Sequence, residues 1–140
     1  MVNRKMKRNE ARKQAVCLLF ERTFNKQDSI ERIIENASES RDLQVDAYAL
    51  RLVKAVEEHQ EEIDGLLQEY SKKWKLHRLT RIVLSILRAA CCEMKYFDDI
   101  PVSVSINEAV ELAKTFAQEE DAAFVNGILG AISRTLPQEG

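Results

Sequence analysis

The chain has 140 residues, of which 45% are apolar and 31% charged, and its net charge is −2. This is the length of one domain and the composition of a soluble globular protein. No apolar run approaches the roughly 20 residues of a membrane span, and no apolar segment of a secretory signal follows the first basic residues. With only four glycines and two prolines, the chain lacks the turn residues of a β-sandwich or barrel, which favours helices.

The charge is unevenly distributed. The first 13 residues, here called the basic arm, hold six basic side chains and one acidic one, a net +5. The other residues hold 15 basic and 22 acidic groups, a net −7. The basic residues are Arg4, Lys5, Lys7, Arg8, Arg12 and Lys13. The local electrostatic field of the arm, and not the overall charge, therefore indicates whether the chain can bind a nucleic acid.

The first half of the chain predicts three helices. The first runs from about Asn9 to Phe24, with an apolar stripe at helical spacing. It continues the basic arm, whose arginines recur every four residues. A second helix near 29–38 follows Asp28 and Glu31, which have capping-box spacing. A long helix runs from about 45 to 70 and is interrupted, or solvent-exposed, in the polar run 57–62.

The second half carries the strongest helical signal, an apolar stripe over 79–94. Leu84 lies off that stripe, so we expect a central core helix that is apolar on more than one side. Ser105 and Glu108 form a capping box that opens the next helix. The acidic link 119–121 leads to a last helix before Pro137. The expected fold is all-α, with about seven helices and no strand.

Neither a metal site nor a catalytic site is expected. His59 and His77 have no HExxH or CxxC neighbours. Cys17, Cys91 and Cys92 each lie within a helical pattern, which predicts buried, reduced thiols and a cytoplasmic protein. No Gly-rich phosphate loop is present.

Gly127 and Gly130 fall in a helical apolar pattern, where they would allow close helix approach. We therefore expect no cofactor and no enzymatic activity.

Two interpretations of the basic arm remain open from the residues alone. A charged terminus can serve solubility only. Arginines four apart can instead follow successive phosphates, and arginine-rich segments commonly order on RNA loops and single strands.

Four segments resemble the NusB family of bacterial transcription antitermination factors. Residues 8–20, RNEARKQAVCLLF, resemble the family's opening, and 87–94 its LRxAxxE helix. Residues 100–114 match IPxxVxINEAVELAK nearly throughout, and 124–129 match FVNGxL. The order is preserved over about 8–133, so the resemblance covers almost the whole chain.

The resemblance implies one NusB-like domain made of two small helical subdomains, about 9–70 and 76–136. It implies binding of the boxA RNA of ribosomal RNA leaders together with NusE, a ribosomal protein, and an indirect action on RNA polymerase. NusE contacts are implied for the helix around 88–96 and the one starting at Ile106. The implied RNA contacts are Arg4, Lys5, Lys7, Arg8, Arg12, Lys13, Gln14, Gln118, Glu119, Glu120, Asp121 and Phe124.

Two features depart from the family pattern. Asn9 and Glu10 stand where many relatives carry arginines, and the segment 118–123 is acidic. Carboxylates repel phosphate, although they accept hydrogen bonds from base amino groups. A stand-alone protein-interaction module or homodimer without strong RNA binding of its own is kept as an alternative, because the central helix is apolar on more than one side.

Overall fold

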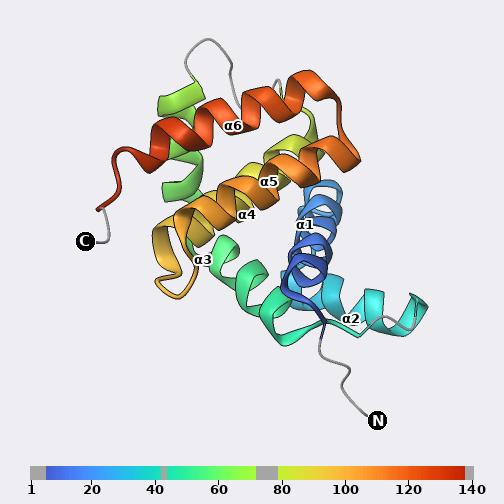
Figure 1. Ribbon diagram of the computed structural model, residues 1–140. Coiled ribbons are helices and arrows are strands. Elements are labelled where there is room, and N and C mark those ends of the chain that lie inside the picture. Colours follow the sequence, from blue (N-terminus) through green and yellow to red (C-terminus); the bar gives the residue numbers. More distant parts are fainter. Residues whose placement is uncertain (1–5, 42–43, 72–78, 138–140) are drawn as a thin grey trace.

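The computed structural model describes residues 6–41, 44–71 and 79–137, and these form helices and connecting turns without any strand (Figure 1). The helices are α1 (Arg8–Phe24), α2 (Ile30–Arg41), α3 (Ala47–Ser71), α4 (Arg81–Tyr96), α5 (Val102–Phe116) and α6 (Glu119–Ser133). The expected all-α class is confirmed. None of the helices in the described part is long and apolar enough to cross a membrane.

The helix α1 buries the stripe that its sequence predicts. Its fully buried residues include Ala11, Ala15, Val16 and Leu18, spaced as one face of a helix requires. The start of α2 differs from the prediction. The backbone N–H of Arg32 donates to Ser29 Oγ at 3.1 Å, so Ser29 caps this helix and the box predicted from Asp28 and Glu31 is wrong.

The expected interruption of the long helix is a kink within α3. His59 has non-helical dihedral angles, φ −110° and ψ 16°, in the middle of the polar run. The chain resumes its helix at once and buries Ile63 and Leu67. The segment is thus one bent helix, and the described residues form six helices where about seven were expected.

The central position expected for the helix over 79–94 is confirmed in α4. This helix packs against α1, α3, α5 and α6 (Figure 1). Neighbours on several sides explain why its apolar residues exceed one stripe. Leu84, which lies off the stripe, is itself packed against the core. Contacts within the chain therefore partly bury the apolar second face, which was the reason to consider a homodimer.

The last two helices begin elsewhere than predicted. The helix α5 starts at Val102 after Pro101, so Ser105 lies inside it and does not cap it. Proline suits this boundary because it has no backbone N–H to donate, and the first residues of a helix have no intrahelical acceptor for one. The acidic run 119–121 is the first turn of α6 and not a link. Negative side chains there oppose the positive end of the helix dipole, which stabilises the helix.

Two of the three cysteines are buried as predicted. Burial raises the pKa of both Cys91 and Cys92 to about 12. The prediction for Cys17 is wrong, because this residue is exposed on α1. The close-approach role of the α6 glycines is also wrong: a Cβ on Gly127 would meet nothing within 4 Å, and one on Gly130 only the end of the Arg134 side chain at 3.9 Å among the described residues.

Replacing Gly127 by alanine should stabilise the protein. The residue is helical and exposed, so the substitution removes backbone entropy from the unfolded state without a clash. The expected gain is about 0.5–1 kcal/mol, read from the midpoint of urea unfolding. Gly65→Ala in α3 meets the same open space and is the matched variant. A loss of stability in both would contradict the open geometry.

Thiol labelling should separate the cysteines. At pH 8 Cys17 should react quickly with Ellman's reagent, and Cys91 and Cys92 only after denaturation, because their folded pKa of about 12 keeps them protonated. Cys17→Ser should abolish the fast phase. Unfolded thiols ionise near pH 8.5, so unfolding releases protons above that pH, and stability should fall as the pH rises from about 9 towards 12. Fast reaction of all three thiols in the native protein would contradict this packing.

Candidate nucleic-acid interface

The structure divides the predicted RNA contacts of the arm into two groups. Lys7, Arg8 and Lys13 are exposed, whereas Arg12 and Gln14 are buried, with 5% and 8% of their surface accessible. Arg4 and Lys5 lie outside the described residues. Arg12 and Gln14, for which the resemblance implies RNA contacts, are thus buried within the fold.

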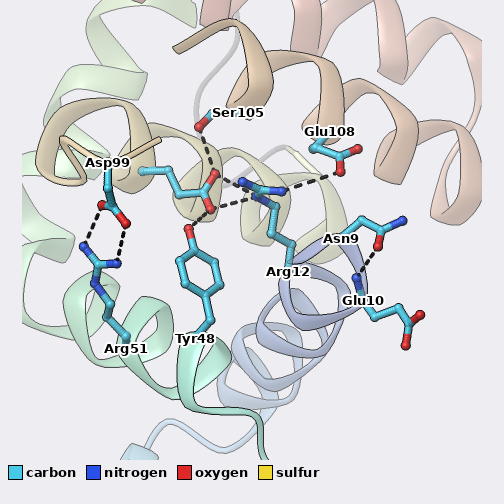
Figure 2. A network of polar contacts seen from close by, with 9 residues as sticks. Asn9, Glu10, Arg12, Tyr48, Arg51, Asp99, Ser105 and Glu108 are labelled. Atoms are coloured by element: carbon cyan, nitrogen blue, oxygen red, sulfur yellow. Dashed lines mark hydrogen bonds and ion pairs between the residues drawn. The ribbon is translucent and has the colours of Figure 1, made fainter. Parts of the chain in front are cut away.

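Arg12 makes a buried ion pair with Glu93 on α4 (Figure 2). Its Nε lies 2.8 Å from Glu93 Oε2 and 3.0 Å from Oε1. The accessible fraction of the Glu93 side chain is 1%. A second carboxylate, from Glu108 on α5, lies 3.5 Å from Arg12 Nη1. The Arg12 guanidinium is thus neutralised inside the protein and is not presented to solvent.

Two hydroxyl groups complete the surroundings of Glu93. Ser105 Oγ, inside α5, donates to Oε1 at 2.8 Å. The Tyr48 hydroxyl, from α3, donates to Oε2 (Figure 2). The pKa of Tyr48 is raised well above its usual value by burial first, and then by the hydrogen bond and the negative charge of Glu93. The phenol therefore stays protonated and remains a donor throughout the physiological range.

Tyr48 also supports an exposed arginine of the arm. The Arg8 guanidinium carbon lies 3.9 Å from the centre of the Tyr48 ring, a cation–π contact. Phe97 packs edge-on against the same ring at 5.8 Å. Arg51 forms two hydrogen bonds of 3.0 and 3.1 Å with Asp99, and these lower the pKa of the Asp99 carboxyl. Arg8 is thus presented from a fixed aromatic surface.

Gln14 joins α1 to the chain that enters α3. Its Nε2 donates to the Gln44 carbonyl at 2.8 Å, and its Oε1 accepts from the Asp46 backbone N–H at 2.8 Å. The backbone N–H of Met6 also donates to Asp46 Oδ2, at 3.4 Å. These bonds hold the last residues of the arm against the start of α3.

The second predicted contact region lies next to the arm. Lys13 Nζ is 5.4 Å from the ring centre of Phe116 at the end of α5, just before α6. Glu119 and Glu120 are exposed, and Phe124 is half-buried against the core. The Gln118 backbone N–H donates to Asp121 Oδ2 at 3.0 Å, so Asp121 has a capping role.

Two residues that hold the start of α1 in place were not predicted from the sequence: Glu93, which pairs with Arg12, and Tyr48, which contacts Arg8. A signal existed for Glu93, since a carboxylate in the middle of the apolar stripe of a central helix needs a cationic partner. Nothing in the sequence indicated that Arg12 would be that partner. Within the described ranges, no group of three or more His, Cys, Asp or Glu side chains is placed to hold a metal ion.

The fold and the exposed cations define a class: an all-helical protein whose first helix begins with exposed cations suited to nucleic-acid phosphates. The chain belongs to the NusB family, whose model matches residues 9–134. The transcription antitermination protein NusB of Acetivibrio thermocellus is 46% identical over 129 residues, covering 91% of this chain and 88% of that protein. NusB of Clostridium botulinum is 39% identical over 140 residues, covering 89% of this chain and 98% of its own length.

Solved structures show the same fold. NusB of T. maritima superposes with a TM-score of 0.84 at 32% identity, covering 94% of this chain and 93% of that one. A chain in a crystal structure of antitermination factors NusB and NusE in complex with double-stranded RNA has a TM-score of 0.81 at 24% identity, covering 92% of this chain and 97% of that one. The latter identity supports the fold alone.

Arg12→Met should destabilise the protein by about 3–5 kcal/mol, because it leaves Glu93 buried without its cation. Lys13→Met, one position along the same helix but exposed, should change the free energy of unfolding by less than about 0.5 kcal/mol. Urea unfolding measures both. The double variant Arg12→Met/Glu93→Met should recover part of the loss. Equal stability of the Arg12 and Lys13 variants would contradict a structural role for Arg12.

Proposed function

We propose that this chain is a transcription antitermination factor that binds boxA-type RNA of ribosomal RNA leaders together with NusE. In that complex it acts indirectly on RNA polymerase, in the cytoplasm, and takes no catalytic step. The observation that carries the proposal is the set of exposed cations at the start of α1, Lys7, Arg8 and Lys13, in a member of the NusB family. The named complex of NusB and NusE with RNA is consistent with it.

The RNA contacts of the arm are Lys7, Arg8 and Lys13, together with Arg4 and Lys5 upstream of the described residues. Each exposed cation that neutralises a phosphate releases a condensed counterion, which makes the affinity salt-dependent. Arg12 and Gln14 act instead as positioning residues. Arg12 Nε binds Glu93, and the Gln14 amide binds Gln44 and Asp46, so exchanging those partners for RNA would leave buried groups unpaired.

The first turn of α6 is the second RNA contact. Lys13 beside Phe116 brings the arm to this end of the molecule. Glu119 and Glu120 are exposed and can accept hydrogen bonds from base amino groups, while Gln118 can also donate. Phe124 can offer an exposed ring edge, as it is only half-buried. The cations supply affinity and the acidic turn supplies base preference.

NusE docks on α5 in this proposal. Most of α4 between Ala89 and Met94 is buried, and Arg88 is paired with Asp64 at 2.8 Å, so α4 offers little surface. The exposed face of α5 carries Val104, with 38% of its surface accessible, and Asn107. In this proposal the chain forms two subdomains, about 9–70 and 76–136, with α1 in the first and α5 in the second.

Arg8→Gln and Lys13→Gln should each weaken binding of a boxA-type RNA in the presence of NusE. Each change removes about one phosphate contact, so the slope of log affinity against log salt should fall by about 0.7 for a single-stranded RNA. Fluorescence anisotropy at several salt concentrations measures both quantities. Lys54→Gln, an exposed lysine on α3, is the matched control and should leave the slope unchanged.

An RNA affinity that does not depend on salt or on the arm would contradict this function. Binding of NusE without any gain in RNA affinity would instead support the protein-interaction module. Sedimentation at several protein concentrations, run alongside, would report a homodimer directly.

A further inference from the structure

A second cationic surface lies at the opposite end of α1 from the arm. A groove of about 790 Å³ opens between the end of α1, the middle of α3 and the first turns of α4. Among the residues that the structure describes, four cationic side chains and one carboxylate, that of Glu57, line it. The cations are Arg22, Lys26, Arg81 and Arg88. In a chain that is acidic outside its arm, this is a local concentration of positive charge.

The four cations are not equally available. Arg22 pairs with Glu57 at 3.2 Å, and Arg88 pairs with Asp64 at 2.8 Å. Lys26 and Arg81 are exposed and make no ion pair with any residue that the structure describes. The two paired arginines shape the wall of the groove, and the two unpaired cations supply its net charge.

An exposed aromatic ring stands beside these cations. Phe24, with 57% of its surface accessible, is the most exposed large apolar side chain of the described residues. The Arg81 guanidinium carbon lies 4.3 Å from its ring centre, and Phe20 packs edge-on against it at 5.0 Å. A held aromatic ring with an adjacent arginine beside a basic groove is the arrangement that single-stranded nucleic-acid sites use to stack bases and follow the backbone.

The exposed face of α1 connects this groove to the arm. Lys13, Cys17 and Phe24 are all exposed. Cys17 and Phe24 follow Lys13 by four and eleven residues, which places all three on one side of the helix. The 17 residues of α1 span about 25 Å at about 1.5 Å per residue. At about 3.4 Å per stacked nucleotide, a strand needs on the order of seven nucleotides to cover that length.

We propose that this groove is a second RNA-contact surface, which binds the strand that leaves the arm along α1. Lys26 and Arg81 neutralise phosphates, and Phe24 stacks a base. The inference rests on the proposed function, because the arm must first engage the same RNA. It extends the contact from one end of α1 to the other.

RNA length is the variable that tests it. The test compares a short boxA-type RNA with two RNAs extended by about eight nucleotides, one on the 5′ side and one on the 3′ side. The short RNA does not reach the far end of α1, whereas an extension of that length covers the helix. Anisotropy titration with the full chain and NusE should show tighter binding of one extended RNA. Its salt slope should be steeper by about 1.4, for two added phosphate contacts.

The variants Lys26→Gln/Arg81→Gln and Phe24→Ala locate the gain. The charge variant should return the salt slope to that of the short RNA, and Phe24→Ala should weaken the extended RNA about tenfold. Binding of the short RNA should stay within about twofold, since the groove lies beyond its reach. Lys54→Gln, which is exposed but does not line the groove, should affect neither RNA. Thermal unfolding checks that the variants fold.

Three results would overturn the inference. The first is that neither extension tightens binding. The second is that the groove variants weaken the short and extended RNAs alike, and the third is that Lys54→Gln acts as strongly as they do. In each case arm-dependent binding of the short RNA leaves the proposed function intact. If the wild-type protein with NusE fails to bind the short RNA, the proposed function fails and this inference falls with it.

Discussion

The structure depends on a carboxylate in the middle of its central helix. Removing a charge from water costs several kcal/mol unless a partner and hydrogen bonds compensate it. Glu93 meets that requirement with Arg12 from α1, Tyr48 from α3 and Ser105 from α5 (Figure 2). Because the donors come from three helices, sliding any of them along α4 would leave a buried polar group unsatisfied, at about 1–3 kcal/mol or more. One carboxylate thus sets the register of three neighbours.

The same interaction decides what the start of α1 can do. Arg12 and Gln14 hold α1 to α4 and to the entry of α3, which leaves the cations beside them facing solvent. Arg8 stacks on Tyr48, the residue that also binds Glu93. The buried network therefore supports the exposed cations: the interior residues fix a rigid helix end, and only the outer cations are available to phosphates. A basic sequence stretch combines a structural and a binding role.

Helix class and order were predictable because apolar periodicity records which face is buried, and α1, α3 and α4 all carry clear stripes. Helix boundaries were less predictable. Ser105 has the spacing of a cap, yet its hydroxyl donates a hydrogen bond to Glu93. A buried carboxylate without donors costs more free energy than an exposed helix end, which water can solvate. Cys17 was expected inside, but it lies on the outer face of α1, since one cysteine among apolar neighbours does not define a face.

The sequence by itself determined the all-α class, the central helix, the positive charge of the arm and the family motifs. These are local properties, readable from spacing and composition. Only the tertiary structure decided which basic residues remain exposed and which pair with buried carboxylates. That depends on contacts between distant residues, such as Arg12 and Glu93, which are 81 positions apart. It also decided that Lys26 and Arg81 line one groove with Phe24 beside them, because α4 packs alongside α1 in the opposite direction, which brings Arg81 to Phe24 as it brings Glu93 to Arg12.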